Sequence, residues 1–216
     1  MCWEKFVRIR QNDDIYAMLP VQHQLKLLEA GLDEAGRGCY AGPVFAAAVI
    51  LPNNFYHPLL NDSKQVTKAN RELLRKVICS DALAWSVAQV SPAEIDRINI
   101  LQATYRAMHK AISGLTIQPE MLLIDGNRFR PYPSIPHVCM IKGDSRLANI
   151  AAASILAKTF RDDYMLQLHA KYPVYAFDKN KGYGTATHRA AIEQQGLSPV
   201  HRKSFNILPV QMKLPL

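Results

Sequence analysis

The chain has 216 residues, of which 49% are hydrophobic and 20% are charged. This length and composition are typical of one soluble globular domain with a real core, and they exclude disordered and fibrous proteins. The formal net charge is +8, and residues 142–216 contribute +6 of it, with 11 Lys/Arg against 5 Asp/Glu. A basic C-terminal third favours a polyanionic partner, with a merely soluble basic surface as the alternative.

Cysteine spacing and hydropathy indicate the compartment. The four cysteines show no C-x-x-C spacing, which argues against a zinc site and a disulfide framework and fits a reducing cytosol. The N-terminus lacks the apolar run of a signal peptide, and no apolar stretch reaches the roughly 20 residues that span a bilayer. We expect a soluble, cytoplasmic protein that makes no membrane contact and is a monomer.

The first predicted elements surround a glycine-rich turn. Residues 21–28 form an amphipathic piece that fits either a helical turn or a lead-in strand. Residues 32–38 and the apolar run 44–51 can pair as a hairpin, because Gly42-Pro43 separates them.

The middle of the chain alternates helices with a strand. Thr67 can cap a helix that runs to about residue 78, and residues 83–90 form a third predicted strand. Ser91-Pro92-Ala93-Glu94 has the pattern of a helix start, and a further helix over 100–112 ends at Gly114.

The second half predicts two short strands and two helices. Residues 121–124 are wholly apolar, as in a central strand covered on both faces, and residues 137–141 form one more strand. A helix from Ser145 to about His169 is apolar almost all round in its first half, so we expect it to be buried. Residues 171–181 look irregular, and a last helix over 185–195 stops at Gly196.

These elements predict an α/β fold with a mixed five-stranded sheet flanked by helices, plus a C-terminal helical portion. We expect residues 1–216 to form a single catalytic domain. Its helical and basic C-terminal portion, from about residue 170 to 216, is not expected to fold independently. The sequence shows no internal repeat and no low-complexity linker.

Acidic residues occur at three places where a predicted strand begins or ends: Asp33 with Glu34, then Asp125, then Asp144. Neighbouring strands bring their ends together, so these carboxylates can meet in one pocket. Such a cluster repels itself unless divalent cations neutralise it, and hard oxygen ligands favour Mg²⁺ or Mn²⁺. Taken singly, Asp144 could instead cap a helix, and Asp125-Gly126 could be simple turn chemistry.

Beside the first acids lies the turn Gly36-Arg37-Gly38. Its two glycines let backbone N–H groups approach another molecule closely, because no Cβ stands in the way. Carboxylates that can hold a metal, next to bare backbone that can touch a phosphate or a sugar, suggest phosphodiester chemistry.

Seven motifs in order resemble the bacterial ribonuclease HII family, the type 2 ribonucleases H, over residues 31–205. They are Asp33-Glu34-Ala35-Gly36-Arg37-Gly38 with Ala41-Gly42-Pro43-Val44, Asn61-Asp62-Ser63-Lys64, Ile124-Asp125-Gly126, Lys142-Gly143-Asp144-Ser145, residues 151–158, Lys181-Gly182-Tyr183-Gly184-Thr185 with His188, and His201-Arg202-Lys203-Ser204-Phe205.

The resemblance implies an RNase H-like fold and a metal-dependent catalytic set of Asp33, Glu34, Asp125 and Asp144, with Asp33 shared by two ions. It also implies that Gly36, Arg37 and Gly38 read the ribose 2′-hydroxyl and the neighbouring phosphates, a role that agrees with the reach of glycine backbone.

Further roles follow from the same resemblance. Tyr183 would pack on the sugar beside the cut, and Lys64 would lie near the scissile phosphate. Backbone phosphate contacts are expected from Arg146, Lys181, Arg189, Arg202 and Lys203. Taken alone, Tyr183 could plug a gap between helices and Lys64 could be a solvated loop residue. We expect His188 and His201 to be structural or helix-terminal rather than catalytic.

The implied activity is an endonuclease that hydrolyses the RNA strand of RNA–DNA hybrids and cuts 5′ of ribonucleotides embedded in duplex DNA, leaving 3′-hydroxyl and 5′-phosphate ends. Two alternatives stay open: a non-catalytic nucleic-acid-binding protein, and another two-metal nuclease of the same fold. The last residues, Gln211 to Leu216, resemble a peptide that binds a bacterial sliding clamp, with a frayed terminus as the alternative.

Overall fold

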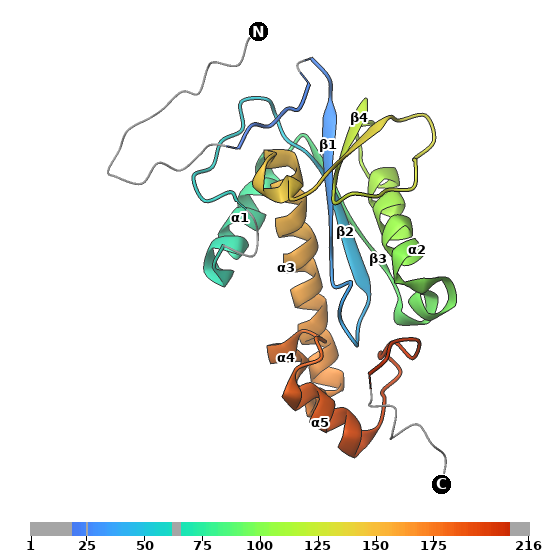
Figure 1. Ribbon diagram of the computed structural model, residues 1–216. Helices are drawn as coiled ribbons and strands as arrows, with labels where there is room; N and C mark the ends of the chain where they lie inside the picture. Colours follow the sequence, from blue (N-terminus) through green and yellow to red (C-terminus); the bar gives the residue numbers. More distant parts are fainter. Residues whose placement is uncertain (1–18, 25, 62–65, 208–216) are drawn as a thin grey trace.

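A five-stranded sheet forms the centre of the computed structural model, which describes residues 19–24, 26–61 and 66–207 (Figure 1). The strand order is β3-β2-β1-β4-β5. The pairs β1–β2 and β2–β3 are antiparallel, whereas β1–β4 and β4–β5 are parallel, so the predicted mixed sheet is confirmed. The strands are β1 (Glu29–Ala35), β2 (Val44–Ile50), β3 (Ala84–Val90), β4 (Met121–Asp125) and β5 (His137–Met140).

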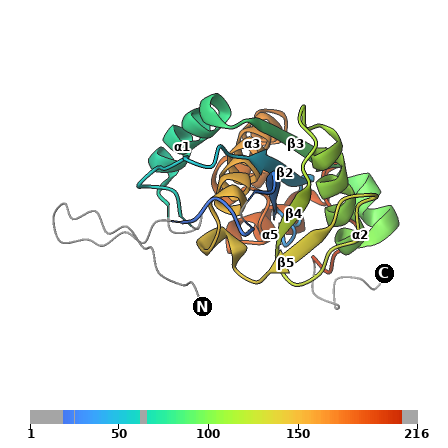
Figure 2. The same ribbon diagram turned by 90° about the horizontal axis from the view of Figure 1, so that it is seen from above.

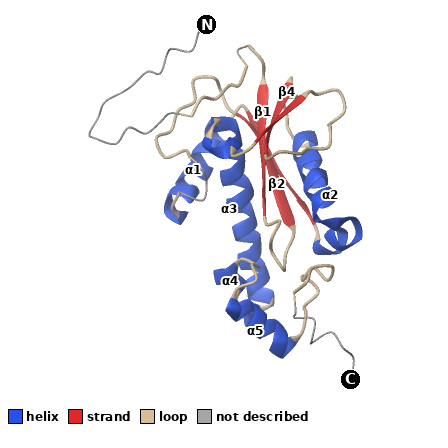
Figure 3. Ribbon diagram, viewed as in Figure 1, coloured by secondary structure: helices blue, strands red, loops and turns tan. Residues whose placement is uncertain are grey.

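Helices cover both faces of this sheet. The helices α1 and α3 lie on one face and α2 lies on the other, as the view from above shows (Figure 2). Beyond the sheet, α4 and α5 pack near the end of α3 (Figure 3). The helices are α1 (Lys68–Asp81), α2 (Pro92–Ser113), α3 (Ala148–Lys171), α4 (Phe177–Asn180) and α5 (Ala186–Gln195), with 3₁₀ turns η1 (Gly143–Ser145) and η2 (Pro173–Tyr175).

The predicted helix boundaries rest on hydroxyl caps. Thr67 Oγ1 accepts the N–H of Asn70, and Ser91 Oγ accepts the N–H of Glu94, each at 3.3 Å. The α2 segment leaves helical geometry at Asn99, where φ is 65°, so the chain forms two helical pieces there as the sequence indicates.

Two predicted elements have wrong boundaries. Strand β1 spans Glu29–Ala35 rather than 32–38, because Glu29 and Ala30 pair with β4, a partner distant in sequence, and the pairing with β2 stops at Ala35. The third helix begins at Ala148 rather than at Ser145, because Leu147 is extended and a 3₁₀ turn precedes it.

Two other segments also differ from expectation. The described residues of 21–28 form neither a helix nor a strand. The segment 171–181, expected to be irregular, contains η2 and α4. In these turns Ala176 and Lys181 adopt the left-handed backbone conformation, which hydropathy patterns do not reveal.

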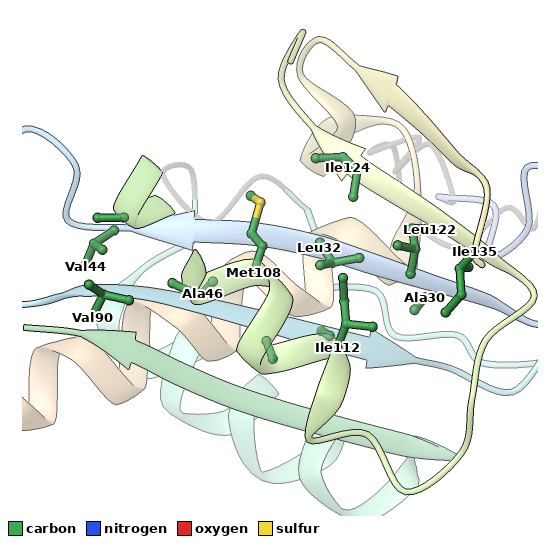
Figure 4. Packing of buried hydrophobic residues seen from close by; sticks show 14 of the residues in the cluster. Ala30, Leu32, Val44, Ala46, Val90, Met108, Ile112, Leu122, Ile124 and Ile135 are labelled. Carbon is green, nitrogen blue, oxygen red and sulfur yellow. The ribbon is translucent and has the colours of Figure 1, made fainter. Parts of the chain in front are cut away.

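The core on the α2 side of the sheet is one continuous cluster. Side chains from β1, β2 and β4, among them Leu32, Ala46 and Leu122, pack against Met108 and Ile112 of α2 (Figure 4). Burying a Leu or Met side chain stabilises the fold by roughly 1.5–3 kcal/mol, so this layer fixes the register of the sheet.

On the other face, the backbone of α3 lies directly against β1. A Cβ placed on Gly31 would stand 2.1 Å from the carbonyl carbon of Asn149, so only glycine permits this approach. The buried Asn149 side chain accepts the N–H of Leu51 and donates to the carbonyls of Val21 and Glu29. These contacts set the position of β1 relative to α3, and the predicted burial of the first half of α3 is confirmed.

The C-terminal portion is anchored by its own apolar cluster. Met165 and Leu168 of α3 pack with Ala41, Phe177 and Ile192. This brings the segment after α3 against the loop that follows β1. No helix among the described residues is long and apolar enough to cross a membrane.

Candidate active site

Two of the predicted acids lie on the same face of neighbouring strand ends. Gly31 of β1 faces α3, so Asp33, two residues further along the strand, faces α3 as well. Leu123 of β4 packs on Ile150 of α3, so Asp125 also points to that face. Leu32 pairs with Ile124 in parallel register, which leaves the two aspartates at adjacent ends of β1 and β4.

Asp33 is a buried carboxyl group in an acidic environment. Its Oδ1 accepts the N–H of Glu34 at 2.7 Å, and Ser154 of α3 hydrogen-bonds its side chain. Burial raises the pKa of Asp33 well above its usual value of 3.8, and the charges of Glu34 and Asp125 raise the pKa further. A cation at this position would relieve both effects.

Asp125 ties the end of β4 to the turn that carries the next acid. Its Oδ1 accepts the N–H of Gly143 at 2.7 Å. A Cβ on Gly143 would stand 2.6 Å from Cδ1 of Ile150, so this turn packs closely against α3. Asp144 follows within η1 and is 3% exposed. Asp144 therefore directly follows the residue that donates to Asp125, and it does not cap α3, whose N-cap is Leu147.

Glu34 lies on the opposite face of β1 from Asp33, because it pairs with Ala46 in the α2-side core. Its carboxylate accepts a hydrogen bond from Arg37 Nη1 at 3.0 Å. Within the described ranges, no three His, Cys, Asp or Glu side chains stand in an arrangement that could hold a metal ion. The donor types and the raised pKa of Asp33 fit a divalent cation, and the shared four-acid site stays a prediction.

The turn after β1 presents an open backbone. Gly36 has φ +91° and lies against the side chain of Arg161, where a Cβ would stand 2.0 Å from Nε. A Cβ on Gly38, by contrast, would meet nothing within 4 Å. The side chain of Arg37 is half exposed. The turn is therefore packed on its inner side at Gly36 and open at Gly38, as close contact with a ligand requires.

The structure contradicts the predicted substrate contact of Arg202. We expected its guanidinium at a phosphate, but the residue is 0% exposed. Its three nitrogens donate to backbone carbonyls of the turn region: Nη2 to Gly36, Nη1 to Arg37 and Nε to Gly42. The prediction is wrong because a charge pattern does not distinguish a surface arginine from one that satisfies buried carbonyls.

Tyr183 lies beside the turn although it is distant in sequence. The residue is 44% exposed, and its side chain hydrogen-bonds Cys39. Burial is the main cause of a raised pKa of the Tyr183 hydroxyl. The N–H of Tyr40 donates to the carbonyl of Gly182 at 2.8 Å, which joins the two segments. A half-exposed aromatic ring next to open glycine backbone can contact a sugar.

The remaining predicted phosphate contacts are exposed, partly buried or outside the described residues. Lys181 Nζ donates to the carbonyl of Asp178 at 2.6 Å, and burial lowers the pKa of Lys181. Arg146, Arg189 and Lys203 are exposed. Lys64 lies outside the described residues.

His188 and His201 form a buried pair. Their Nε2 atoms are 3.0 Å apart, and Nδ1 of His201 accepts the N–H of Ser198 at 2.9 Å. Burial lowers the pKa of both rings, that of His201 to about 4. This arrangement agrees with the predicted structural role.

Sequence reasoning missed two residues at the site. Ser154, which contacts Asp33, lies within the expected buried helix and within the matched motif 151–158, but no role was predicted for it. Arg161 is 1% exposed and carries a charge inside a mostly buried helix, a signal that a helical-face analysis could have used.

Comparison with solved structures defines the class of fold. A ribonuclease HII in a complex with PCNA from Archaeoglobus fulgidus covers 85% of this chain and 97% of that chain, with a TM-score of 0.70 and 24% identity. The Bst-RNase HIII structure in complex with Mn²⁺ covers 86% of this chain and 69% of that chain, with a TM-score of 0.65 and 21% identity. The fold is RNase H-like, as predicted.

Sequence comparison gives the family. The model of the family described as Ribonuclease HII matches residues 30–208. A ribonuclease HII from Bacteroides thetaiotaomicron is 62% identical over 182 residues, which cover 84% of this chain and 91% of that relative. The chain belongs to the ribonuclease HII family. It is accordingly a type 2 ribonuclease H, a hydrolase that acts as an endoribonuclease on RNA–DNA hybrids.

Proposed function

We propose that this ribonuclease H also cuts the phosphodiester 5′ of a ribonucleotide embedded in duplex DNA, and that its metal-dependent hydrolysis leaves 3′-hydroxyl and 5′-phosphate ends. The observation that carries the proposal is the buried Asp33 beside Asp125, at the end of β1 from which the open turn at Gly36 begins. Acidic ligands and a sugar-reading backbone would then act on the same stretch of substrate.

The proposed metal ligands are Asp33, Glu34, Asp125 and Asp144, with Asp33 shared and Mg²⁺ or Mn²⁺ as the ion. Carboxylate oxygens suit these cations. The raised pKa of Asp33 supports the assignment, because a bound cation would stabilise the ionised form. Two such ions, when bound, would supply water activation and stabilisation of the leaving oxygen.

The chain's own residues would select and orient the substrate. The backbone at Gly36 and Gly38, with Arg37, would contact the 2′-hydroxyl, the group that distinguishes RNA from DNA. Tyr183 would pack on the neighbouring sugar, which would hold the scissile phosphate in register with Asp33.

Backbone phosphates would be bound by cationic side chains other than the buried Arg202. Each neutralised phosphate contributes to a salt dependence of binding, so affinity should fall steeply as salt rises. The proposed contacts are Lys64, Arg146, Lys181, Arg189 and Lys203.

Three substrates test the proposal: a DNA duplex with one ribonucleotide, the same duplex in all-DNA form, and an RNA–DNA hybrid, each with Mg²⁺ or Mn²⁺. We expect a single cut 5′ of the ribonucleotide, cutting of the hybrid, and no cutting of all-DNA. Comparable cutting of all-DNA would favour another nuclease of this fold, and binding without turnover would favour a non-catalytic protein.

We further propose that the protein is cytoplasmic and monomeric and that Gln211–Leu216, which lie outside the described residues, bind a sliding clamp. The PCNA complex of a structural neighbour motivates the clamp proposal. Deletion of 211–216 should abolish retention on a bacterial clamp column and leave cleavage unchanged; unaltered retention would end the proposal.

A further inference from the structure

Arg202 fixes which way two peptide groups of the glycine turn point. Its Nη2 donates to the carbonyl of Gly36 at 2.7 Å and its Nη1 donates to the carbonyl of Arg37 at 2.8 Å. In a planar trans peptide the C=O and the N–H of the next residue point in opposite directions. The N–H groups of Arg37 and Gly38 are therefore directed away from Arg202.

These two N–H groups are available to a ligand. Neither donates to an acceptor among the residues that the structure describes. A Cβ on Gly38 would meet no atom within 4 Å, so the approach to its backbone is open. Successive N–H groups that point the same way form a concave site for an anionic or hydroxyl oxygen.

A second buried arginine, Arg161, links this turn to the segment that carries Tyr183. Its Nη2 donates to the carbonyl of Ala41 at 3.3 Å, and its Nη1 donates to the carbonyl of Lys181 at 2.9 Å. The same side chain contacts Gly36, and its guanidinium carbon lies 5.9 Å from the ring centroid of Tyr183. One side chain thus holds the glycine turn and the aromatic residue in a fixed relation.

We propose that Arg202 and Arg161 are positioning residues for ribose recognition: they aim the N–H groups of Arg37 and Gly38 at the 2′-hydroxyl and its neighbouring phosphate, and they hold Tyr183 beside them. The inference rests on the proposed function of the turn. Donors fixed before binding lose little conformational freedom when the substrate arrives. A charge-assisted bond to each carbonyl also strengthens the N–H of the same peptide as a donor.

The test compares Arg202→Lys and Arg161→Lys with Arg75→Lys. Lysine keeps the charge but loses the planar fork that reaches several carbonyls. Arg75 is a matched control, because it contacts Asp163 and Phe160 on the other side of α3 and does not touch the turn. The measured quantities are kcat and KM on a duplex with one ribonucleotide and the inhibition constant of the same duplex in all-DNA form.

We expect each site variant to raise KM for the ribonucleotide duplex about tenfold, the size of one lost hydrogen bond, with the all-DNA inhibition constant nearly unchanged. Arg75→Lys should leave the ratio of KM for the ribonucleotide duplex to the all-DNA inhibition constant at its wild-type value, even if this variant lowers the melting temperature. Folded Arg202→Lys and Arg161→Lys proteins with the wild-type ratio would overturn the inference.

If the variants do not fold, a second measurement on wild-type protein tests whether the N–H groups of Arg37 and Gly38 meet the ribose. In wild-type protein labelled with ¹⁵N, the amide resonances of Arg37 and Gly38 should shift more on adding the ribonucleotide duplex than on adding all-DNA. Equal shifts would overturn the inference. If wild-type protein itself neither cuts nor prefers the ribonucleotide duplex, the proposed function fails instead.

Discussion

At the scale of single residues, the site depends on a carboxyl group that folding makes less acidic. The pKa of Asp33 is raised by burial first and by neighbouring acids second. The folded chain therefore keeps a proton on Asp33 at pH values where the unfolded chain has lost it. The stability that this group contributes is present below its usual pKa of 3.8 and is lost as the pH rises through the raised value.

Asp33→Asn should reduce cleavage at least about 100-fold, on the scale of losing one electrostatic group in a catalytic site, and should retain binding of the ribonucleotide duplex. In metal-free buffer at pH 7 its melting temperature should equal or exceed that of wild-type protein, because the ionised carboxylate is removed from a buried position. The exposed Glu193→Gln is the control and should behave as wild type. Near-normal turnover of Asp33→Asn would refute the catalytic assignment.

Candidate residues can be found in a sequence most easily where their chemistry needs no knowledge of burial, although their shared site stays a prediction. The acids at strand ends and the paired glycines are visible in the order of letters. Arg202 and Arg161 were not predictable in their observed roles, because a letter does not show whether a guanidinium meets a phosphate or buried carbonyls. Their roles emerge only from contacts such as that of Arg202 with Gly36.

At the scale of elements, the position of α3 on β1 depends on Gly31. Gly31→Ala should destabilise the fold by about 1–3 kcal/mol or more, as overpacking of a tight site does, because the added Cβ overlaps the backbone at Asn149. Gly38→Ala is the matched control, since its Cβ meets no protein atom. Chemical denaturation should show a lower midpoint only for Gly31→Ala; equal midpoints would contradict the packing account.

Gly38→Ala should weaken substrate binding without lowering the stability of the fold. Its methyl group enters the open space at the turn, so the affinity for a ribonucleotide duplex should fall although the denaturation midpoint does not. Unchanged affinity, measured by fluorescence anisotropy, would show that substrate does not approach this backbone.

The buried pair of His188 and His201 makes the stability of the C-terminal portion sensitive to acid. The pKa of His201 is lowered from 6.5 to about 4 by burial and by His188. The unfolded chain therefore binds protons that the folded chain excludes, and stability is lost as the pH falls from about 6.5 toward 4. The melting temperature should drop by roughly several degrees between pH 7 and pH 5, and by less in His201→Gln. An equal drop in both proteins would contradict this origin.

Sequence patterns predicted most elements but misplaced boundaries where long-range contacts decide. The helix caps at Thr67 and Ser91 are local signals and were confirmed. The start of β1 depends on pairing with β4, and the start of α3 depends on the turn at Gly143. Neither is encoded in a short window of sequence.

At the scale of the whole molecule, we propose that the chain is one folding unit. The C-terminal portion shares its apolar cluster with α3 and with Ala41, and Arg202 reaches back to the turn after β1. Thermal unfolding should therefore be a single transition by calorimetry and by circular dichroism. Two separated transitions would show that the portion after residue 170 is independent.

Calorimetric titration with Mn²⁺ would show whether the distant acids at the strand ends share bound cations. Wild-type protein should bind Mn²⁺ saturably at pH 7. Asp33→Asn and Asp125→Asn should each weaken that binding at least about tenfold, because each variant removes a carboxylate ligand, and Glu193→Gln should not. If both aspartate variants bound Mn²⁺ as wild-type protein does, the shared cation site would be contradicted.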